Sequence, residues 1–287
     1  MTGKIQNAVT TAKKSDQKSI KQLIQAMQPQ IAKALPSVMT PERFTRIALT
    51  AISTNPKLAE CTQSSFLGAL MQAAQLGLEP NTPLGHAYLI PYRNKGVMEC
   101  QFQEGYRGMI DLAHRSKEFT NIGAHEVYEK DEFEFEYGLE PKLVHKPYIG
   151  PDRGKVILYY GMYKLVNGGY GFEVMSRSDV EAHAKRFSKA YSSGPWQSDF
   201  DAMAKKTVLK KALKYAPLKV EFVRQIVQDE TIKDEIDENM SDVMDKTIYE
   251  DAVEADYTVA EDGGIASEEL DAEAEAMAEA ERMAGQA

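Results

Sequence analysis

The sequence is poor in cysteine and tryptophan, and it has no long apolar run. Its 287 residues include two cysteines, Cys61 and Cys100, and a single tryptophan. Two cysteines form at most one disulfide and lack the C-x-x-C spacing of a zinc site, which is typical of a reducing compartment. No stretch has the length and apolar character of a signal peptide or a membrane span. These absences predict a soluble, cytosolic protein.

Motifs for nucleotide chemistry are also absent. The sequence contains no GxxxxGK[ST] loop and no GxGxxG after a predicted strand, and its five histidines lack ligand spacing. Acidic residues gather at 131–136, but aromatic residues alternate with them, which favours a strand with aromatic side chains inward over a metal site. No cofactor is therefore expected. A metal-dependent nuclease that uses the acids of 126–136 stays open as an alternative.

The net charge of −9 averages two unlike regions. Residues 228–287 carry 21 Asp and Glu against three Lys and Arg, a charge of −18, whereas residues 1–227 carry 31 Lys and Arg against 22 Asp and Glu, a charge of +9. A basic body with an acidic tail suggests nucleic-acid binding, with a tail that competes for the same surface or docks a partner. The alternative is that the tail only keeps the body in solution.

The order of predicted elements indicates an α+β fold with a mainly antiparallel sheet. Residues 1–35 are expected to form an N-terminal amphipathic arm of two short helices, 36–227 a core, and 228–287 a flexible, disordered tail. Within the core, two helices precede a hairpin that turns at 94–96. A short helix, several strands and two further helices follow. Ser178 and Glu181 are expected to form the capping box of the helix that precedes the last one.

The segment WQSDFDAMAKKTVLKKALKYAPL, residues 196–218, contains the strongest candidate site. A helix is expected to start at Ser198 and to stop before Pro217. On such a helix Val208, Leu209, Ala212, Leu213 and Ala216 form a buried stripe, and Lys206, Lys210 and Lys214 project from the opposite face. No acid occurs in 205–219. Contact with successive phosphates of a nucleic-acid strand therefore explains this face better than ordinary solvation does.

Three long motifs resemble one known family. These are SFLGALMQAAQLGLEPNTPLGHAYLIPYRN (65–94), ECQFQEGYRGMIDLAHRS (99–116) and W-x-x-DF-x-AMAKKTVLKKALKYAP (196–217). They are similar to the RecT-type single-strand annealing recombinases of bacteriophages and prophages, and with their spacing the resemblance covers residues 30–225. It implies a Rad52-like annealing core beside a basic groove, assembled into rings or helical filaments on DNA without ATP.

The resemblance also implies partners and a site. The partners are single-stranded DNA, the annealed duplex intermediate, further copies of the chain, a 5′ to 3′ exonuclease and the single-strand-binding protein of a bacterial host. The expected DNA-binding residues are Arg93, Lys95, Tyr106, Arg107, Arg115, Lys185, Lys189, Trp196, Lys205, Lys206, Lys210 and Lys211. Of these, the lysines at 205–211 are expected to grip phosphates and the two aromatic residues to shape the groove. No catalytic residue is expected, and Mg²⁺ enters only as a modulator of annealing.

Two further expectations concern assembly. The arm at residues 19–35 is expected to bury Ile20, Leu23 and Ile24 against a neighbouring subunit. A self-assembling phage structural protein, whose basic face meets the acidic tail of its neighbour, is the alternative outside nucleic-acid chemistry.

Overall fold

A computed structural model describes residues 20–188, 191–192, 195–216, 229–237, 239–248 and 253–254. The α+β class predicted from the sequence is confirmed, with helices packed on antiparallel strands. The helices are α2 (Ile20–Ala26), α3 (Gln28–Ala34), α4 (Pro41–Thr54), α5 (Gln63–Leu76), α6 (Tyr106–Ser116), α7 (Arg177–Phe187), α8 (Pro195–Ser198) and α9 (Phe200–Leu213), with 3-10 turns η1 (Pro56–Glu60) and η2 (Met240–Asp242).

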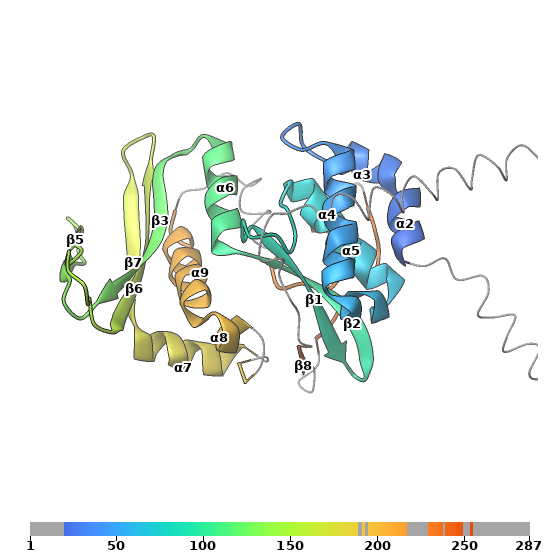
Figure 1. Ribbon diagram of the computed structural model, residues 1–287. Helices are drawn as coiled ribbons and strands as arrows, with labels where there is room; N and C mark the ends of the chain where they lie inside the picture. The colour runs from blue at the N-terminus through green and yellow to red at the C-terminus, as the bar shows by residue number, and fades with distance from the viewer. Residues whose placement is uncertain are drawn as a thin grey trace, which may run out of the picture.

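The strands form three antiparallel groups, in the orders β2-β1-β8, β3-β6-β7 and β4-β5. The strands are β1 (Ala87–Asn94), β2 (Val97–Glu104), β3 (Phe119–Tyr128), β4 (Glu132–Glu136), β5 (Lys142–Lys146), β6 (Val156–Leu165), β7 (Tyr170–Ser176) and β8 (Val253–Glu254). In Figure 1 the β1-β2 hairpin lies with α2–α5 on the right, and the β3-β6-β7 sheet lies with α7 and α9 on the left.

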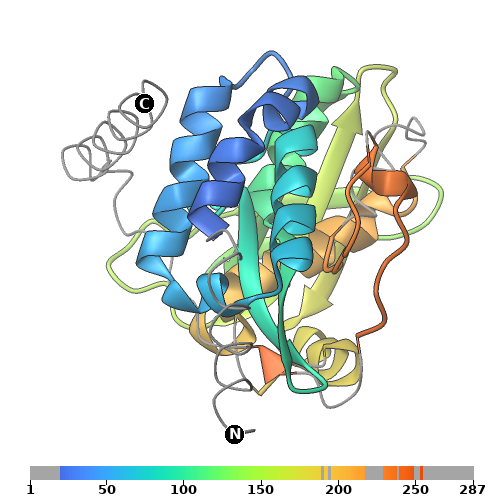
Figure 2. The same ribbon diagram turned by 90° about the vertical axis from the view of Figure 1, so that its right-hand side faces the viewer.

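The β1-β2 hairpin supports the helices of the N-terminal half, which lie in front of it in Figure 2. Its two-residue turn at Lys95 and Gly96 has φ values of 48° and 78°, the left-handed conformation that twists correctly for a tight hairpin. Helix α5 is buried along almost its whole length and ends at Gly77, whose φ of 61° gives the left-handed cap that the sequence predicts. The turn and the cap therefore agree with expectation.

The two short helices expected in the N-terminal arm are present, but their apolar face packs inside the chain. Ile24 and Ile31 are completely buried, Ile20 is 7 % exposed, and all three belong to the main hydrophobic core. Helices α2 and α3 pack against α4 of the same chain. The expected burial of Ile20 and Ile24 against a neighbouring subunit is therefore replaced by burial against α4, and Leu23 packs against the same core.

Helix α9 covers one face of the β3-β6-β7 sheet at very close range (Figure 1). A Cβ atom placed on Gly161 of β6 would lie 2.7 Å from the backbone of Leu209, so only glycine permits this approach. Helix α7, which precedes α8 and α9 in the chain, begins earlier than expected. Its capping box uses Ser176 and Asp179, because Ser176 has the extended backbone that an N-cap residue needs.

The β4-β5 hairpin extends from the far end of this sheet, at the left of Figure 1. The segment alternates acids with aromatic residues as predicted, but the aromatic side chains are not all inward. Phe133 stacks on Tyr160 of β6 with ring centroids 5.5 Å apart, whereas Phe135 and Tyr137 are 40 % and 56 % exposed. The acids of β4 lie on the opposite face. There Glu132 contacts Lys146 at 2.6 Å, and Glu134 contacts Lys142 at 3.8 Å.

The first part of the acidic region, residues 229–248 without residue 238, packs against the core. Ile232 and Met240 are completely buried, and Thr231 exchanges two backbone hydrogen bonds with Phe102 of β2. Figure 2 shows this segment in orange beside the helices of the N-terminal half. Strand β8 then pairs with the edge of β1. The expected boundary at 228 therefore precedes residues that contribute to the core, while most of the tail beyond 248 lies outside the described residues.

No helix among the described ranges combines the length and apolar character needed to cross a membrane.

Candidate nucleic-acid interface

Helix α9 begins at Phe200, capped by the side chain of Asp199, which accepts a hydrogen bond from Ala202 N–H at 3.0 Å. The preceding turn forms the separate short helix α8, so the single helix expected from Ser198 is interrupted at residue 199. The predicted apolar stripe is correct. Val208, Leu209, Ala212 and Leu213 are buried, and Ala216 packs against the core.

The lysines of α9 do not form one exposed row. Lys206 is 3 % exposed, whereas the side chains of Lys210 and Lys211 are 37 % and 38 % exposed. The expectation that the Lys206 ammonium group projects into solvent is wrong. Lys206 lies three residues from Met203 and from Leu209, both buried, so it shares their side of the helix.

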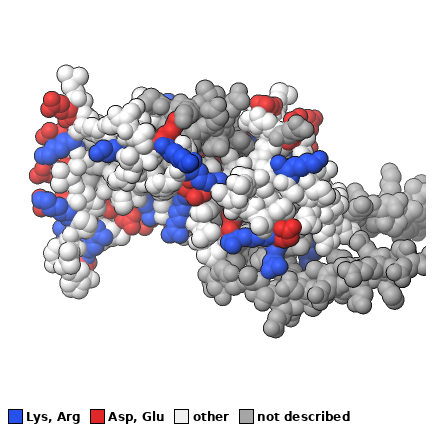
Figure 3. Space-filling model, turned by 90° about the horizontal axis from the view of Figure 1, so that it is seen from above, with Lys and Arg blue, Asp and Glu red and all other residues white. Residues whose placement is uncertain are grey.

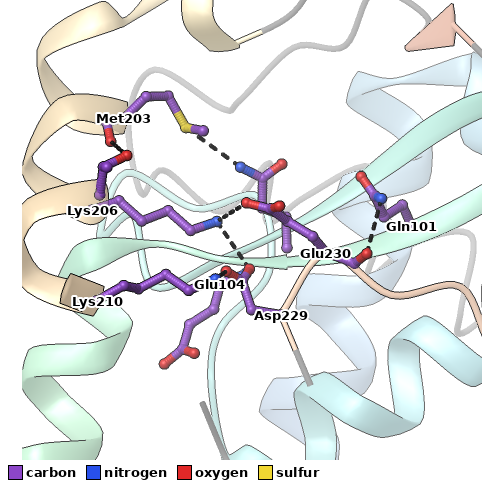
Figure 4. Close-up of polar contacts among 9 residues, drawn as sticks. Gln101, Glu104, Met203, Lys206, Lys210, Asp229 and Glu230 are labelled. Atoms are coloured by element: carbon purple, nitrogen blue, oxygen red, sulfur yellow. Dashed lines mark hydrogen bonds and ion pairs between the residues drawn. The ribbon is translucent and has the colours of Figure 1, made fainter. Parts of the chain in front are cut away.

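Two acidic residues beyond the helix compensate this buried charge (Figure 4). Lys206 Nζ lies 2.9 Å from Asp229 Oδ1 and 3.0 Å from Glu230 Oε1, and Lys210 Nζ lies 2.7 Å from Asp229 Oδ2. Asp229 is itself buried, and Glu104 N–H donates to Asp229 Oδ1 at 2.7 Å. A buried carboxylate thus receives hydrogen bonds from two ammonium groups and one backbone amide.

The pKa values in this cluster follow from burial and charge. Burial acts to raise the pKa of Asp229, but Lys206 and Lys210 outweigh it and hold this pKa below its usual value. Burial acts to lower the pKa of Lys210, but Asp229 and Glu230 raise it above its usual value. Burial and the negative charge of Asp229 raise the pKa of Glu104 well above its usual range, and neither carboxyl oxygen of Glu104 has a hydrogen-bond partner among the described residues.

Lys205 points to a different group, at the N-terminus of α6. Its Nζ lies 5.1 Å from the centre of the Tyr106 ring and 3.3 Å from Glu126 Oε2. Arg107, which is exposed, donates from Nε to the Tyr106 hydroxyl at 3.3 Å. Helices α6 and α9 therefore bring together Lys205, Tyr106 and Arg107, three of the residues expected to bind DNA, and this set is named the α6–α9 cluster below.

Lys211 and Lys214 extend the positive charge along α9. Lys211 Nζ is 3.9 Å from Glu173 Oε1 of β7, a longer contact than those of Lys206 and Lys210, and Lys214 is exposed. The end of the molecule formed by β4 and β5 carries positive and negative side chains side by side (Figure 3). On α9, too, each of the lysines Lys205, Lys206, Lys210 and Lys211 lies near an acid, and the contact of Lys211 is the longest of the four.

The other predicted residues lie apart from these groups. Arg93 and Lys95 are exposed at the end of the β1-β2 hairpin, and Arg115 at the C-terminus of α6 donates to Leu76 O at 2.8 Å. Lys185 on α7 contacts Glu181 of the same helix at 2.7 Å. Trp196 is 7 % exposed and packs edge-on against Phe200 inside the core. Lys189 lies outside the described residues.

The acids of 126–136 do not converge. The side chain of Asp131 is completely buried and accepts hydrogen bonds from Arg153 Nε at 3.1 Å and from the backbone N–H groups of Tyr128 and Tyr148 at 2.9 and 2.8 Å. His145 Nε2 also lies 3.1 Å from Asp131 Oδ2. Nowhere in the described ranges do three His, Cys, Asp or Glu side chains gather as a metal ion requires.

Sequence reasoning missed Asp229, Glu230 and Glu104 as members of the site. Asp229 and Glu230 stand at the start of an acidic run, where they resemble a solvated tail. The available signal was the helical position of Lys206 between Met203 and Leu209, because a lysine on a buried face requires a carboxylate partner.

Comparisons with known proteins agree with the long motifs. The model of the RecT family matches residues 42–244. The chain is 45 % identical to Protein RecT of Escherichia coli (strain K12) over 209 residues, which is 71 % of this chain and 77 % of that protein. It is also 31 % identical to the uncharacterized protein YqaK of Bacillus subtilis (strain 168) over 196 residues, 68 % of this chain and 66 % of that one.

Proposed function

This chain belongs to the RecT family, and from that membership we propose that it is a single-stranded DNA annealing protein of phage homologous recombination that works without ATP. The observation that carries the proposal is the positive surface of α9 and α6, because it lies within the part of the chain that matches the family. Its members are the α6–α9 cluster and the partly exposed Lys210 and Lys211.

The chemistry of such a surface fits annealing better than base-specific recognition. Ammonium and guanidinium groups hold phosphates regardless of sequence, whereas deep stacking on aromatic rings would hide base edges from a second strand. The buried position of Trp196 leaves the half-buried Tyr106 as the aromatic residue of this cluster. A strand held by its backbone presents its bases outward, and base pairing supplies about 1.4 kcal/mol per stacked step.

Assembly and partners belong to the same proposal. Several subunits side by side would align a long strand, so that short complementary stretches are sampled and then extended. A 5′ to 3′ exonuclease would produce the single strand, and the host single-strand-binding protein would cover it first. The acidic residues beyond 248 are the proposed contact for these partners, since 13 Asp and Glu against one Arg give them a charge of −12, which suits a basic protein surface.

The test is the annealing of two complementary oligonucleotides without ATP, followed by a fluorescent label on one strand. Replacing Lys205 and Lys211 together by Gln should slow annealing and reduce the slope of log K against log salt for single-strand binding by about 1.4, or about 0.7 per lost phosphate contact. The matched control replaces Lys142 and Lys146 of the β4-β5 hairpin, which contact Glu134 and Glu132 much as Lys205 and Lys211 contact Glu126 and Glu173, but lie on a different element.

Three outcomes would contradict parts of the proposal. A nuclease would shorten a labelled strand in Mg²⁺ or Mn²⁺, whereas an annealing protein leaves its length unchanged. A structural protein would assemble to the same extent with and without DNA. Equal loss of binding in the Lys205/Lys211 and Lys142/Lys146 variants would remove α9 as the site while leaving annealing itself intact.

A further inference from the structure

The carboxylate of Asp229 occupies a site built from donors. Lys206 Nζ and Glu104 N–H approach its Oδ1 at 2.9 and 2.7 Å, and Lys210 Nζ approaches its Oδ2 at 2.7 Å. We name these three donors the anion cradle. Figure 4 shows them converging from helix α9 and strand β2 on the single Asp229 side chain. Ammonium groups together with a backbone amide are the donors with which proteins bind phosphate oxygens.

Asp229 and Glu230 cancel the charge that the sequence assigns to DNA. Lys206 is neutralised by both acids and Lys210 shares Asp229, so two of the four lysines at 205–211 face a pair of carboxylates. A phosphate oxygen that reached Lys206 would have to replace one of these carboxylates, because only 3 % of that lysine is exposed. In this arrangement the chain itself fills the cradle.

The acids are attached to the core by a short length of chain. Thr231 N–H donates to Phe102 O at 3.3 Å and Phe102 N–H donates to Thr231 O at 3.0 Å, while Gln101 Nε2 donates to Glu230 O at 3.2 Å. Glu230 has a φ of 63°, a left-handed conformation that is unfavourable for a residue with a side chain. Its own side chain is about half exposed. Releasing residues 229–231 breaks these bonds, the buried bond from Gln72 Nε2 to Thr231 Oγ1 at 2.8 Å and the contacts of the two acids with Lys206 and Lys210, so a bound phosphate has to replace the acids at both lysines.

We propose that the anion cradle is a phosphate subsite for the DNA backbone, which Asp229 and Glu230 occupy in the free protein and which a bound strand takes over by displacing them. This inference rests on the proposed function. It adds that Asp229 and Glu230 of the chain itself compete with DNA for the site. It predicts that the protein binds DNA in two ways. Binding is weak through the exposed Arg107 and the partly exposed Lys205 and Lys211, whose side chains are 16 % and 38 % exposed, and it is tighter once residues 229–231 are released. The acidic segment and the DNA backbone then compete for the same lysines of α9.

The first experiment uses the unaltered full-length chain. Amide hydrogen exchange is measured with and without an oligo-dT single strand, at the amides of Phe102, Glu104 and Thr231, whose hydrogen bonds join the segment to the core. Exchange at Phe102 and Thr231 should become faster when DNA is bound, while amides of helix α5 stay protected. Unchanged or slower exchange at these positions in a DNA-bound sample would overturn the inference.

The second experiment tests the competitor by removing its charge. Glu230→Gln and Asp229→Asn should each tighten single-strand binding about fivefold at 0.1 M salt and steepen the salt slope by about 0.7, which is the effect of one added phosphate contact. Asp245→Asn is the matched control, because Asp245 contacts Lys233 at 2.9 Å, away from α9. A thermal melt of each variant reports whether it is folded. Since the Glu230 side chain is half exposed, Glu230→Gln keeps the test valid if Asp229→Asn does not fold.

The outcomes separate the two proposals. Lys206→Met in the Glu230→Gln background should return binding to the wild-type level if the released lysine holds phosphate. Unchanged affinity in folded Glu230→Gln protein that still anneals DNA would overturn the masked cradle alone. Failure of the wild-type protein to bind or anneal single strands would overturn the proposed function instead.

Discussion

Two acidic runs of this molecule look alike in sequence and differ completely in structure. The run at 132–136 lies on an exposed strand, where Glu132 and Glu134 contact lysines of the neighbouring strand in water. The pair Asp229 and Glu230 meets lysines of α9, and one of its members is buried together with Lys206. The first run makes contacts of low energetic value, whereas the second is required to compensate a buried charge.

The comparison shows that the energetic role of a run of acidic residues depends on whether the lysines it contacts are exposed or buried. Every residue of strands β4 and β5 is exposed or half-buried, so their ion pairs compete with water and salt. Lys206 lies among the buried residues of α9, so its ion pair with the buried Asp229 is in a region of low dielectric, whereas Glu230 is half exposed. Within the acidic sequence at 131–136, Asp131 follows the second pattern, since its side chain is completely buried against Arg153 and His145.

The largest effect is expected from Lys206→Met. This change leaves the buried Asp229 with Lys210 and one amide, and removing one partner of a buried ion pair costs roughly 4 kcal/mol of unfolding free energy. Lys211→Met, which breaks a contact of 3.9 Å at a partly exposed site, should cost less than about 0.5 kcal/mol. Urea denaturation of both variants checks the prediction, and similar losses in the two would contradict the contrast.

Asp131→Asn should come next, at roughly 3 kcal/mol, because an amide cannot accept from Arg153 and from two backbone N–H groups at once. Burial acts to raise the pKa of Asp131, but Arg153 and the backbone N–H groups lower it below its usual value. Its stabilisation is therefore present above the unfolded pKa and is lost as pH falls through the lowered folded one. The deficit of the variant should shrink in acid, and a pH-independent deficit in urea denaturation would argue against ionisation as its cause.

Glu104→Gln should increase the free energy of unfolding, whereas Asp131→Asn decreases it. The folded pKa of Glu104 is raised, so the wild-type protein loses stability as pH rises from the unfolded value toward the folded one. The variant should therefore be more stable than the wild-type protein at pH 8, and this gain should shrink toward pH 4. The charged groups around Glu104 are Asp229, Lys206, Lys210 and Arg115. The unfolding free energies of the wild-type protein and the variant are measured by chemical denaturation from pH 4 to pH 8, a range in which Lys and Arg stay charged. If Glu104 did not titrate, the difference between the two proteins would be the same at every pH.

The smallest effect is expected on the β4-β5 hairpin. Glu132→Gln removes an exposed ion pair to Lys146 and should change stability by less than about 0.5 kcal/mol, with any effect disappearing in high salt. Thermal melts at low and high salt provide the measurement. A loss comparable to that of Asp131→Asn would show that exposure does not separate the two acidic patterns.

Local signals in the sequence are sufficient for much of the fold. The tight turn at Lys95 and Gly96, the cap at Gly77 and the apolar stripe of α9 each depend on neighbours in the chain, and all are predicted correctly. The capping box lies two residues before its predicted place, because Ser176 and Ser178 both offer a hydroxyl and an acid three residues on. Strand β5 has no clear sequence signal, since Lys142–Lys146 is stabilised by pairing with β4 and has little apolar pattern of its own.

The site is less predictable because its partners are distant in sequence. Lys206 and Asp229 are 23 residues apart, and Glu104 is 125 residues from Asp229. Charge counting separates the acidic region from the body, although tertiary contacts place its first residues inside the core. Lys205, Tyr106 and Arg107 are each predicted as DNA-binding residues, but the sequence alone does not show that they converge. They meet because α6 and α9 pack side by side.

Strand β8 bears on how the chain can be shortened. It pairs with β1 through Tyr92 and Arg93, and it therefore covers backbone groups that would otherwise form an open edge of the sheet. Removing residues 229–254 as a dispensable acidic extension would uncover that edge together with the apolar site of Ile232. Unpaired edges recruit strands from other molecules. A truncated protein would then form aggregates through β1, and in the microscope such particles would resemble the assemblies proposed for the intact chain.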